Sequence, residues 1–355
     1  MNLSKKALIL SSYSFSHMVV DFVCATLVLS LGSLWIIDTT TLINYIILYN
    51  VLAFGLQTPI GYLADSFKVS KSLSLISCIL LAVSLIPFYL NFSLACVIII
   101  WIANACFHIW WWITTLALGP WEARIPWIFV APWALWLFLW ILYWKSWNLF
   151  WWECLALLIT AFTTMLLSSL QFNPYEIAKN FYKEEIKKKI TFKIPAILIT
   201  GLLFISIIIR SMIWFLIQYS WKSEILFWLF FILCIVAGKF FWGILADKYG
   251  WKRIWVGSLI LSLLCLLLGE NYFIFWMIWI FLFNITMPIA FMWMIKAYPW
   301  RQWLMFWLLC LALLIWALPM LFNIQFNNRT IVVVYLILLS SILLYIALDS
   351  LRIKK

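Results

Sequence analysis

The sequence predicts an all-α membrane protein whose twelve transmembrane helices form two pseudo-symmetric six-helix bundles. Three observations indicate this fold class. Apolar residues make up 67% of the 355 residues, charged residues make up only 10%, and one short motif occurs in both halves of the chain. Soluble domains average about 45–50% apolar and about 25% charged residues. The composition therefore excludes a soluble enzyme, a disordered chain and a secreted disulfide scaffold.

Twelve apolar segments follow one another along the chain, and a helix that crosses a bilayer needs about 20 such residues. They cover residues 8–36, 41–63, 72–90, 92–118, 124–144, 149–171, 194–219, 224–246, 252–269, 271–296, 301–322 and 330–349. Most separators are a few residues long, but 171–193 is polar and basic. We therefore expect an N-terminal six-helix bundle (1–170), a cytoplasmic basic linker (171–193) and a C-terminal six-helix bundle (194–355).

Basic residues indicate how the chain is oriented. If the N-terminus is cytoplasmic, 19 of the 24 Lys and Arg residues lie on the cytoplasmic side, 3 lie outside and 2 lie within spans. An excess of Lys and Arg marks cytoplasmic loops. We therefore expect a multi-pass protein of the cell (cytoplasmic) membrane with both termini in the cytoplasm. The net charge of +12 then reflects topology and not nucleic-acid binding.

A short motif follows the second and the eighth apolar segments. The first copy reads Gly61-Tyr62-Leu63-Ala64-Asp65, and the second reads Gly243-Ile244-Leu245-Ala246-Asp247 and continues with Lys248, Gly250, Lys252 and Arg253. The first copy departs from the second after Asp65, where Ser66 and Lys68 replace the basic residue and the glycine. Related six-helix halves are typical of one large class of transporters.

At these residues the chain resembles the major facilitator superfamily, which carries G-x-L-x-D-[RK]-x-G-[RK]-[RK] between helices 2 and 3 and often again between helices 8 and 9. The resemblance implies secondary transport and a cytoplasmic gate motif at Gly61, Asp65, Gly243, Asp247, Lys248, Gly250, Lys252 and Arg253. Ala131-Pro132 is similar to a motif of proton antiporters, and Phe107-His108 is similar to the fosmidomycin-resistance branch of bacterial drug exporters.

The two motif aspartates could act as a cytoplasmic latch, for a reason that follows from helix electrostatics. An aspartate at the start of a helix meets unpaired N–H groups and the positive end of the helix dipole. With basic residues nearby and a short loop, Asp65 and Asp247 would form a latch on the cytoplasmic side. The alternative is that these charges only set the topology.

Conspicuous polar residues interrupt the apolar spans that the resemblance places around a central cavity, namely helices 1, 4, 7 and 10. They are His17, Asp21, Asn104, His108, Arg210 and Asn284. Ionisable residues within spans are costly and usually functional. We therefore expect these six residues to form the substrate and proton-coupling site.

Each of these residues has more than one interpretation. His17 and Asp21 are either a proton-coupling pair or a static pair that fastens helix 1 to helix 2 through Asn50. His108 binds substrate, shares the proton or is a core histidine. Arg210 pairs with Asp21, meets an anionic substrate or is a snorkelling structural arginine.

The leading functional hypothesis is a monomeric secondary transporter that moves a small molecule by alternating access, coupled to protons, with efflux favoured by the fifth helix. The alternatives are a membrane-embedded enzyme and a non-transporting structural membrane protein. No H-E-x-x-H sequence, CxxC pair or P-loop is present. We therefore expect no enzyme activity, no cofactor and no metal site.

The tryptophan content is anomalous. The chain has 27 Trp and 10 Gly, and thirteen of the Trp lie between Trp101 and Trp152. Trp136, Trp140 and Trp144 have the four-residue spacing that small residues have where membrane helices pack closely. Our hypothesis is that most of these positions are glycine in the living protein, in a lineage that reads UGA as glycine. The alternative is a genuine Trp-rich or engineered chain.

Overall fold

The structure is a computed structural model of the whole chain. It describes residues 3–33, 37–67, 72–119, 122, 124–132, 135, 151–171, 191–216, 225–269, 272–284, 287–298, 301–315 and 329–352. Most of the expected linker and of the fifth span lies outside the described residues. Among the described residues, each of the twelve expected spans contains a helix. The all-α fold class is confirmed.

The chain divides into two compact units. The first consists of Met1–Pro120 and Ile128–Lys179, and the second of Trp121–Trp127 and Asn180–Lys355. By length and composition, seven of the described helices could cross a membrane, and four shorter helices are also apolar. Each unit therefore holds several helices suited to a bilayer.

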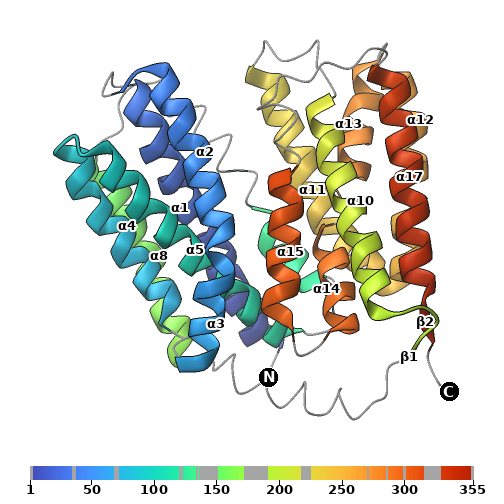
Figure 1. Cartoon of the computed structure of the whole chain (residues 1–355), viewed down its shortest axis with the longest axis horizontal. Coiled ribbons are helices and arrows are strands. Elements are labelled where there is room, and N and C mark those ends of the chain that lie inside the picture. Colours follow the sequence, from blue (N-terminus) through green and yellow to red (C-terminus); the bar gives the residue numbers. More distant parts are fainter. Residues whose placement is uncertain are drawn as a thin grey trace. The chain divides into compact units, whose positions relative to one another are not determined.

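The first unit is built around its N-terminal helix (Figure 1). Its helices are α1 (Leu3–Ser33), α2 (Thr39–Gly55), α3 (Gln57–Phe67), α4 (Leu73–Tyr89), α5 (Ser93–Leu118) and α8 (Trp151–Gln171). Helix α1 packs against α2, α4, α5 and α8. Most of it is buried.

The second unit holds the remaining long helices (Figure 1). They are α10 (Ala196–Leu216), α11 (Ile225–Tyr249), α12 (Trp251–Gly269), α13 (Phe273–Phe283), α14 (Met287–Ala297), α15 (Gln302–Ile315) and α17 (Arg329–Asp349). Helix α10 packs against α14, α15 and α17, and α12 packs against α11, α13 and α17. Two short strands, β1 (Thr191–Phe192) and β2 (Leu351–Arg352), pair antiparallel.

Two expected spans are each divided into two helices, and a proline accounts for both breaks. A proline clashes with the carbonyl group four residues before it. Pro59 is four residues after Gly55, where α2 ends, and Pro288 is four residues after Asn284, the residue that caps α13. Both prolines then lie in the first turn of the next helix, where the missing N–H costs little.

Candidate functional site

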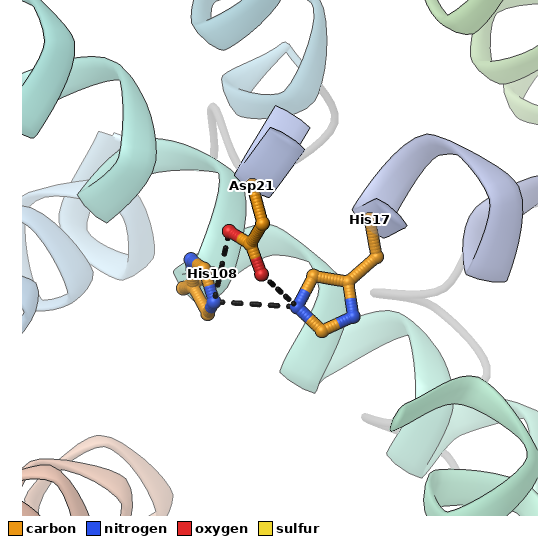
Figure 2. A group of neighbouring side chains, drawn as sticks. All are labelled: His17, Asp21 and His108. Atoms are coloured by element: carbon orange, nitrogen blue, oxygen red, sulfur yellow. Dashed lines mark hydrogen bonds and ion pairs between the residues drawn. The ribbon is translucent and has the colours of Figure 1, made fainter. Parts of the chain in front are cut away.

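Two pairs of polar residues from α1 and α5 face each other inside the first unit. His17 and Asp21 lie one turn apart on α1, and Asn104 and His108 lie one turn apart on α5. Because α1 packs against α5, the two pairs meet, as Figure 2 shows for the two histidines and the aspartate. Four of the six expected site residues therefore form one cluster.

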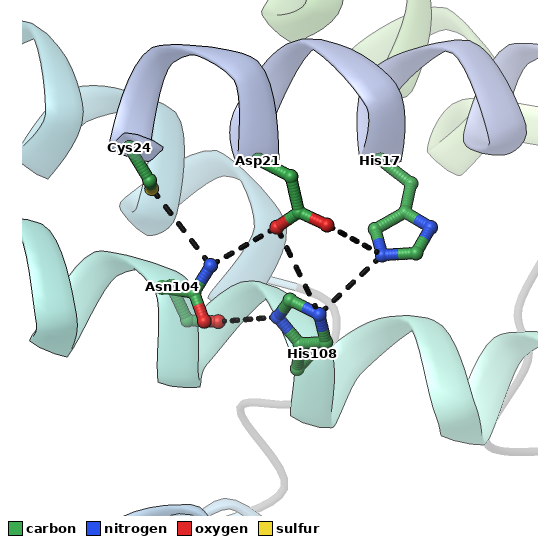
Figure 3. A network of polar contacts seen from close by, with 5 residues as sticks. All are labelled: His17, Asp21, Cys24, Asn104 and His108. Atoms are coloured by element: carbon green, nitrogen blue, oxygen red, sulfur yellow. Dashed lines mark hydrogen bonds and ion pairs between the residues drawn. The ribbon is translucent and has the colours of Figure 1, made fainter. Parts of the chain in front are cut away.

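Asp21 is at the centre of this cluster. Its Oδ2 lies 3.1 Å from His17 Nε2, and its Oδ1 accepts a hydrogen bond from Asn104 Nδ2 at 3.1 Å. His108 Nε2 lies 3.9 Å from Asp21 Oδ1 and 3.4 Å from His17 Nε2. Figure 3 shows these contacts from the side of the two helices. The carboxylate thus lies among two imidazoles and one amide.

Hydrogen bonds and ring contacts fix the orientation of both histidines. His108 Nδ1 lies 3.0 Å from the backbone oxygen of Asn104. A carbonyl oxygen only accepts, so Nδ1 carries the proton, and the Nε2 of a neutral His108 is an acceptor. The ring of His17 stacks on Phe107 and on Phe129, with centroid distances of 5.9 Å and 4.7 Å.

Three members of the cluster are shielded from solvent. The exposed fraction is 2% for His17, 7% for Asp21 and 5% for Asn104. A buried carboxylate costs several kcal/mol unless it is paired. Within the first unit, no described Lys or Arg forms an ion pair with Asp21, so the histidines and Asn104 are its partners.

Further groups complete the surroundings of the cluster. Cys24, one turn further along α1, receives a long contact from Asn104 Nδ2 to its Sγ at 3.8 Å. Tyr49 of α2 contacts the thiol of Cys24. Sequence reasoning did not identify either residue, because neither is charged.

One alternative expectation is wrong. The sequence suggested that Asn50 fastens the His17–Asp21 pair to helix 2, but Asn50 Nδ2 donates to Ile46 O of its own helix at 2.7 Å. Asn104 of α5 makes the contact with Asp21 instead. The sequence alone did not decide between the two asparagines. Only the packing of α1 on α5 shows that Asn104 is the partner.

Three of these side chains could hold a metal ion. His17, Asp21 and His108 each offer one ligand atom, and the three atoms lie within 4.8 Å of one another. The sequence analysis expected no metal site, because the chain has no H-E-x-x-H sequence and no CxxC pair.

Arg210 is a buried cation in the second unit, with 7% exposure. Its Nη2 donates to the backbone oxygen of Phe283, the last residue of α13, and its guanidinium lies 4.6 Å from the centroid of the Phe283 ring. Arg210 thus binds a carbonyl in the last turn of α13, where backbone oxygens have no partner within the helix. Among the described residues, its Nε and Nη1 have no hydrogen-bond partner.

Asn284 is the sixth expected site residue. It caps α13, and its Nδ2 donates to Ile280 O at 2.8 Å. It therefore lies next to the residue that Arg210 contacts. The expected pairing of Arg210 with Asp21 would join the two units and stays a prediction.

Asp247 of the gate motif meets a helix N-terminus, but not that of its own helix. It lies in the last turn of α11, where its Oδ2 accepts from the backbone N–H of Arg124 at 2.9 Å. Arg124 is the first residue of α6 (Arg124–Val130). The Oδ1 accepts from Trp251 Nε1 at 3.0 Å. The expectation of an aspartate at the start of its own helix is therefore corrected.

The glycines of the second motif copy have structural reasons. A Cβ atom on Gly243 would lie 2.7 Å from the side chain of Trp127 and 2.9 Å from Arg124 Cα, so only glycine fits there. Gly250 separates α11 from α12 with a φ of +95°, which favours glycine. In the first copy, Gly61 and Asp65 lie in α3, and the side chain of Asp65 is outside the described residues.

The basic residues of the motif lie around the same turn. The Nζ of Lys248 is 5.2 Å from the ring centroid of Tyr249, and Arg253 is exposed. Lys252 Nζ lies 2.6 Å from Asp349 Oδ1, and Lys193 Nζ lies 2.7 Å from Asp349 Oδ2. Sequence reasoning missed Asp349, because its partners are distant in the sequence and the acidic residue has no motif around it.

Comparisons with known proteins agree with this architecture. No family model and no curated protein matches the chain. Among solved structures, FucP, a major facilitator superfamily transporter in its outward conformation, superimposes with a TM-score of 0.66 at 11% identity and covers 96% of this chain and 98% of its own. The human organic anion transporter MFSD10 gives a TM-score of 0.65 at 13% identity and covers 96% of this chain and 99% of its own.

A variant of the E. coli fucose:proton symporter FucP gives a TM-score of 0.65 at 11% identity over 97% of this chain and 98% of its own. Identities this low establish a fold and not a substrate or a mechanism. The likeness nevertheless extends over nearly the full length of each chain. The protein has the fold of the major facilitator superfamily transporters.

Proposed function

We propose that this protein is a secondary transporter that moves a small molecule across the cell membrane by alternating access, driven by protons, with efflux as its direction. Transporters built from repeated helix bundles move largely rigid halves around a site near the middle of the membrane. The fold and the apolar helices support transport. Both termini would lie in the cytoplasm, and the protein would act as a monomer in the lipid bilayer.

The observation that carries the proton coupling is the buried contact of His17, Asp21 and His108. An ionisable group inside a transmembrane helix is most often part of an ion or proton pathway. Here two imidazoles lie beside one carboxylate, with nitrogen–oxygen distances of 3.1 Å and 3.9 Å. Besides the two histidines, the described titratable groups near this carboxylate are Cys24 on the same helix and Tyr49 on α2.

The remaining site residues have assigned roles in this proposal. Arg210 and Asn284 would line the substrate path in the second unit, where the unpartnered donors of Arg210 can meet a polar substrate. Asp247, held by the N–H of Arg124, would act in the cytoplasmic gate. One structural neighbour is described as a fucose:proton symporter and another as an organic anion transporter, and both descriptions are compatible with this proposal.

A pH-jump assay tests the proposal. The protein is reconstituted in liposomes that contain a pH-sensitive dye, and a panel of metabolites and drugs is added outside. We expect at least one compound to change the internal pH only when the protein is present. The Asp21→Asn variant should lose this change, whereas Cys24→Ser, which alters contacts with Asn104 and Tyr49 but none with the two histidines, should keep it.

Two results would contradict the proposal. The first is that no compound of a broad panel causes proton movement with the wild-type protein. The second is that Asp21→Asn transports a substrate with the same dependence on the pH gradient as the wild type. The direction is tested with the same vesicles by reversing the gradient. Efflux coupled to protons requires that substrate and proton move in opposite directions.

A further inference from the structure

The three side chains at the centre of the cluster direct their ligand atoms toward one point. His17 and His108 both present Nε2, and Asp21 presents its carboxylate between them (Figure 2). The His17 Nε2 and His108 Nε2 atoms are 3.4 Å apart, and His17 Nε2 is 3.1 Å from Asp21 Oδ2. Two nitrogen atoms at this distance share one proton or share a cation.

These separations match the edges of a tetrahedral metal site. A zinc ion binds imidazole nitrogen and carboxylate oxygen at about 2.0–2.2 Å, so two ligands of a tetrahedron lie about 3.3–3.5 Å apart. Two of the three separations are within about 0.3 Å of that range. The third, 3.9 Å, is measured from His108 Nε2 to Asp21 Oδ1, whereas Oδ2 is the oxygen near His17, so the carboxylate must turn for one oxygen to complete the site with both imidazoles.

Hydrogen bonds hold two of the three ligands as they do in metal sites. A ligating histidine almost always donates its other N–H to a carbonyl or carboxylate, and a ligating carboxylate accepts a further hydrogen bond. Asn104 supplies both groups, because its backbone oxygen lies 3.0 Å from His108 Nδ1 and its amide donates to Asp21 Oδ1 at 3.1 Å. Phe107 and Phe129 hold the ring of His17 by stacking.

We propose that His17, Asp21 and His108 form a binding site for a divalent transition-metal ion, with Zn²⁺ as the best fit. Two imidazoles and one carboxylate suit zinc and its neighbours, whereas Mg²⁺ and Ca²⁺ prefer oxygen ligands and Cu(I) prefers sulfur. Three protein ligands leave a fourth position for water or another group. In the metal-bound form, His17 carries its proton on Nδ1, and the lone pair of its Nε2 binds the metal.

The binding of the metal does not depend on transport, but its role rests on the proposed function. A transporter that holds a divalent cation at its buried carboxylate would carry that cation or couple to it. The site lies within one unit, so all three ligands move together when that unit moves.

The chain suits a direct spectroscopic test, because it contains only two histidines. Full-length protein with any histidine tag removed is titrated in detergent with Co²⁺, a visible-light substitute for Zn²⁺. We expect one Co²⁺ per chain, tetrahedral absorption bands without a thiolate charge-transfer band, and displacement by Zn²⁺. Nitrogen NMR of histidine-labelled protein should show both Nε2 atoms shifting when Zn²⁺ is added.

Variants separate ligands from neighbours. His17→Gln and His108→Gln should each weaken Zn²⁺ binding about 100-fold or more, because loss of a group that merely orients a ligand already costs 10–100-fold. Cys24→Ser is the matched control and should bind within about threefold of wild type, since its Sγ contacts Asn104 and not the three ligand atoms. A thiolate band, or unchanged binding in both histidine variants, would overturn the proposal.

The wild-type NMR experiment keeps the test independent of variant folding. If neither histidine responds to Zn²⁺, the metal site does not exist, and the proposed function survives when pH-driven transport is observed. If both respond and the protein moves no protons, the site stands and the proton-coupled function fails.

Discussion

Replacing Asp21 with asparagine separates a functional carboxylate from a structural one. The variant keeps the size of the side chain and removes its charge. The amide oxygen can still accept from Asn104, and the amide nitrogen then faces His17 Nε2 across the 3.1 Å contact. His17 can accept that bond by moving its proton to Nδ1. Both contacts therefore persist as neutral hydrogen bonds.

The expected change in the free energy of unfolding is small, because two effects oppose each other. A hydrogen bond to a charged group contributes about 1.5–3 kcal/mol and a neutral one about 0.5–1.5 kcal/mol, so two bonds together lose about 2–3 kcal/mol. Removing a buried charge regains a desolvation cost on the order of several kcal/mol. The two terms nearly cancel, and we expect a net change within about 2 kcal/mol.

The assay measures stability and coupling on the same preparation. Unfolding in mixed micelles gives the free energy, and the pH-jump assay in liposomes gives proton movement. We expect near-native stability with proton movement lost. A variant destabilised by more than about 3 kcal/mol, whose folded fraction still moves protons, would show that Asp21 only fastens α1 to α5.

Three further predictions concern the helix ends and the buried arginine. Asp247→Ala should speed hydrogen exchange at the Arg124 amide about tenfold, since a lost cap costs about 0.5–2 kcal/mol; mass spectrometry of that peptide measures it, and no change would refute the contact. Hydrogen bonds from Thr41 lower the pKa of Asp38. Asp38 should therefore stabilise the start of α2 fully when the pH is above its unfolded pKa of about 4. Hydrogen exchange at the start of α2 should rise as the pH falls through the lower pKa of Asp38 in the folded protein. Arg210→Met should insert at least as well as wild type, because a central arginine costs about 2.5–3.5 kcal/mol, and should lose transport; retained transport would make Arg210 a cap only.

The spacing of residues predicted each pair of the cluster, His17 with Asp21 and Asn104 with His108, but not the contact between the two pairs. Four-residue spacing places His17 with Asp21 and Asn104 with His108 on one helix face each, and that requires only the helical repeat. Which faces meet depends on how α1 and α5 are rotated when they pack, and the packing of many apolar side chains decides this. The preference for Asn104 over Asn50 as the partner of Asp21 therefore came only from the structure.

Contacts to backbone atoms were missed for a different reason. Arg210 binds the carbonyl of Phe283, and Asp247 binds the N–H of Arg124. Every residue has these backbone groups, so the partner leaves no trace in the sequence. A proline four residues after a helix end is a signal that the sequence does carry. It accounts for the end of α13, where Arg210 binds the carbonyl of Phe283.

Buried tryptophans in the structure support the hypothesis that many of these positions are glycine in the living protein. The indole N–H groups of Trp101, Trp127 and Trp255 are buried and have no hydrogen-bond partner among the described residues. Buried indoles usually find one, and each unpaired donor costs about 1–3 kcal/mol. Glycine would remove that cost. We expect UGA codons at these three positions and peptides that weigh as glycine. UGG codons with tryptophan masses would refute the recoding and would require unseen partners, such as water or lipid, for the three indoles.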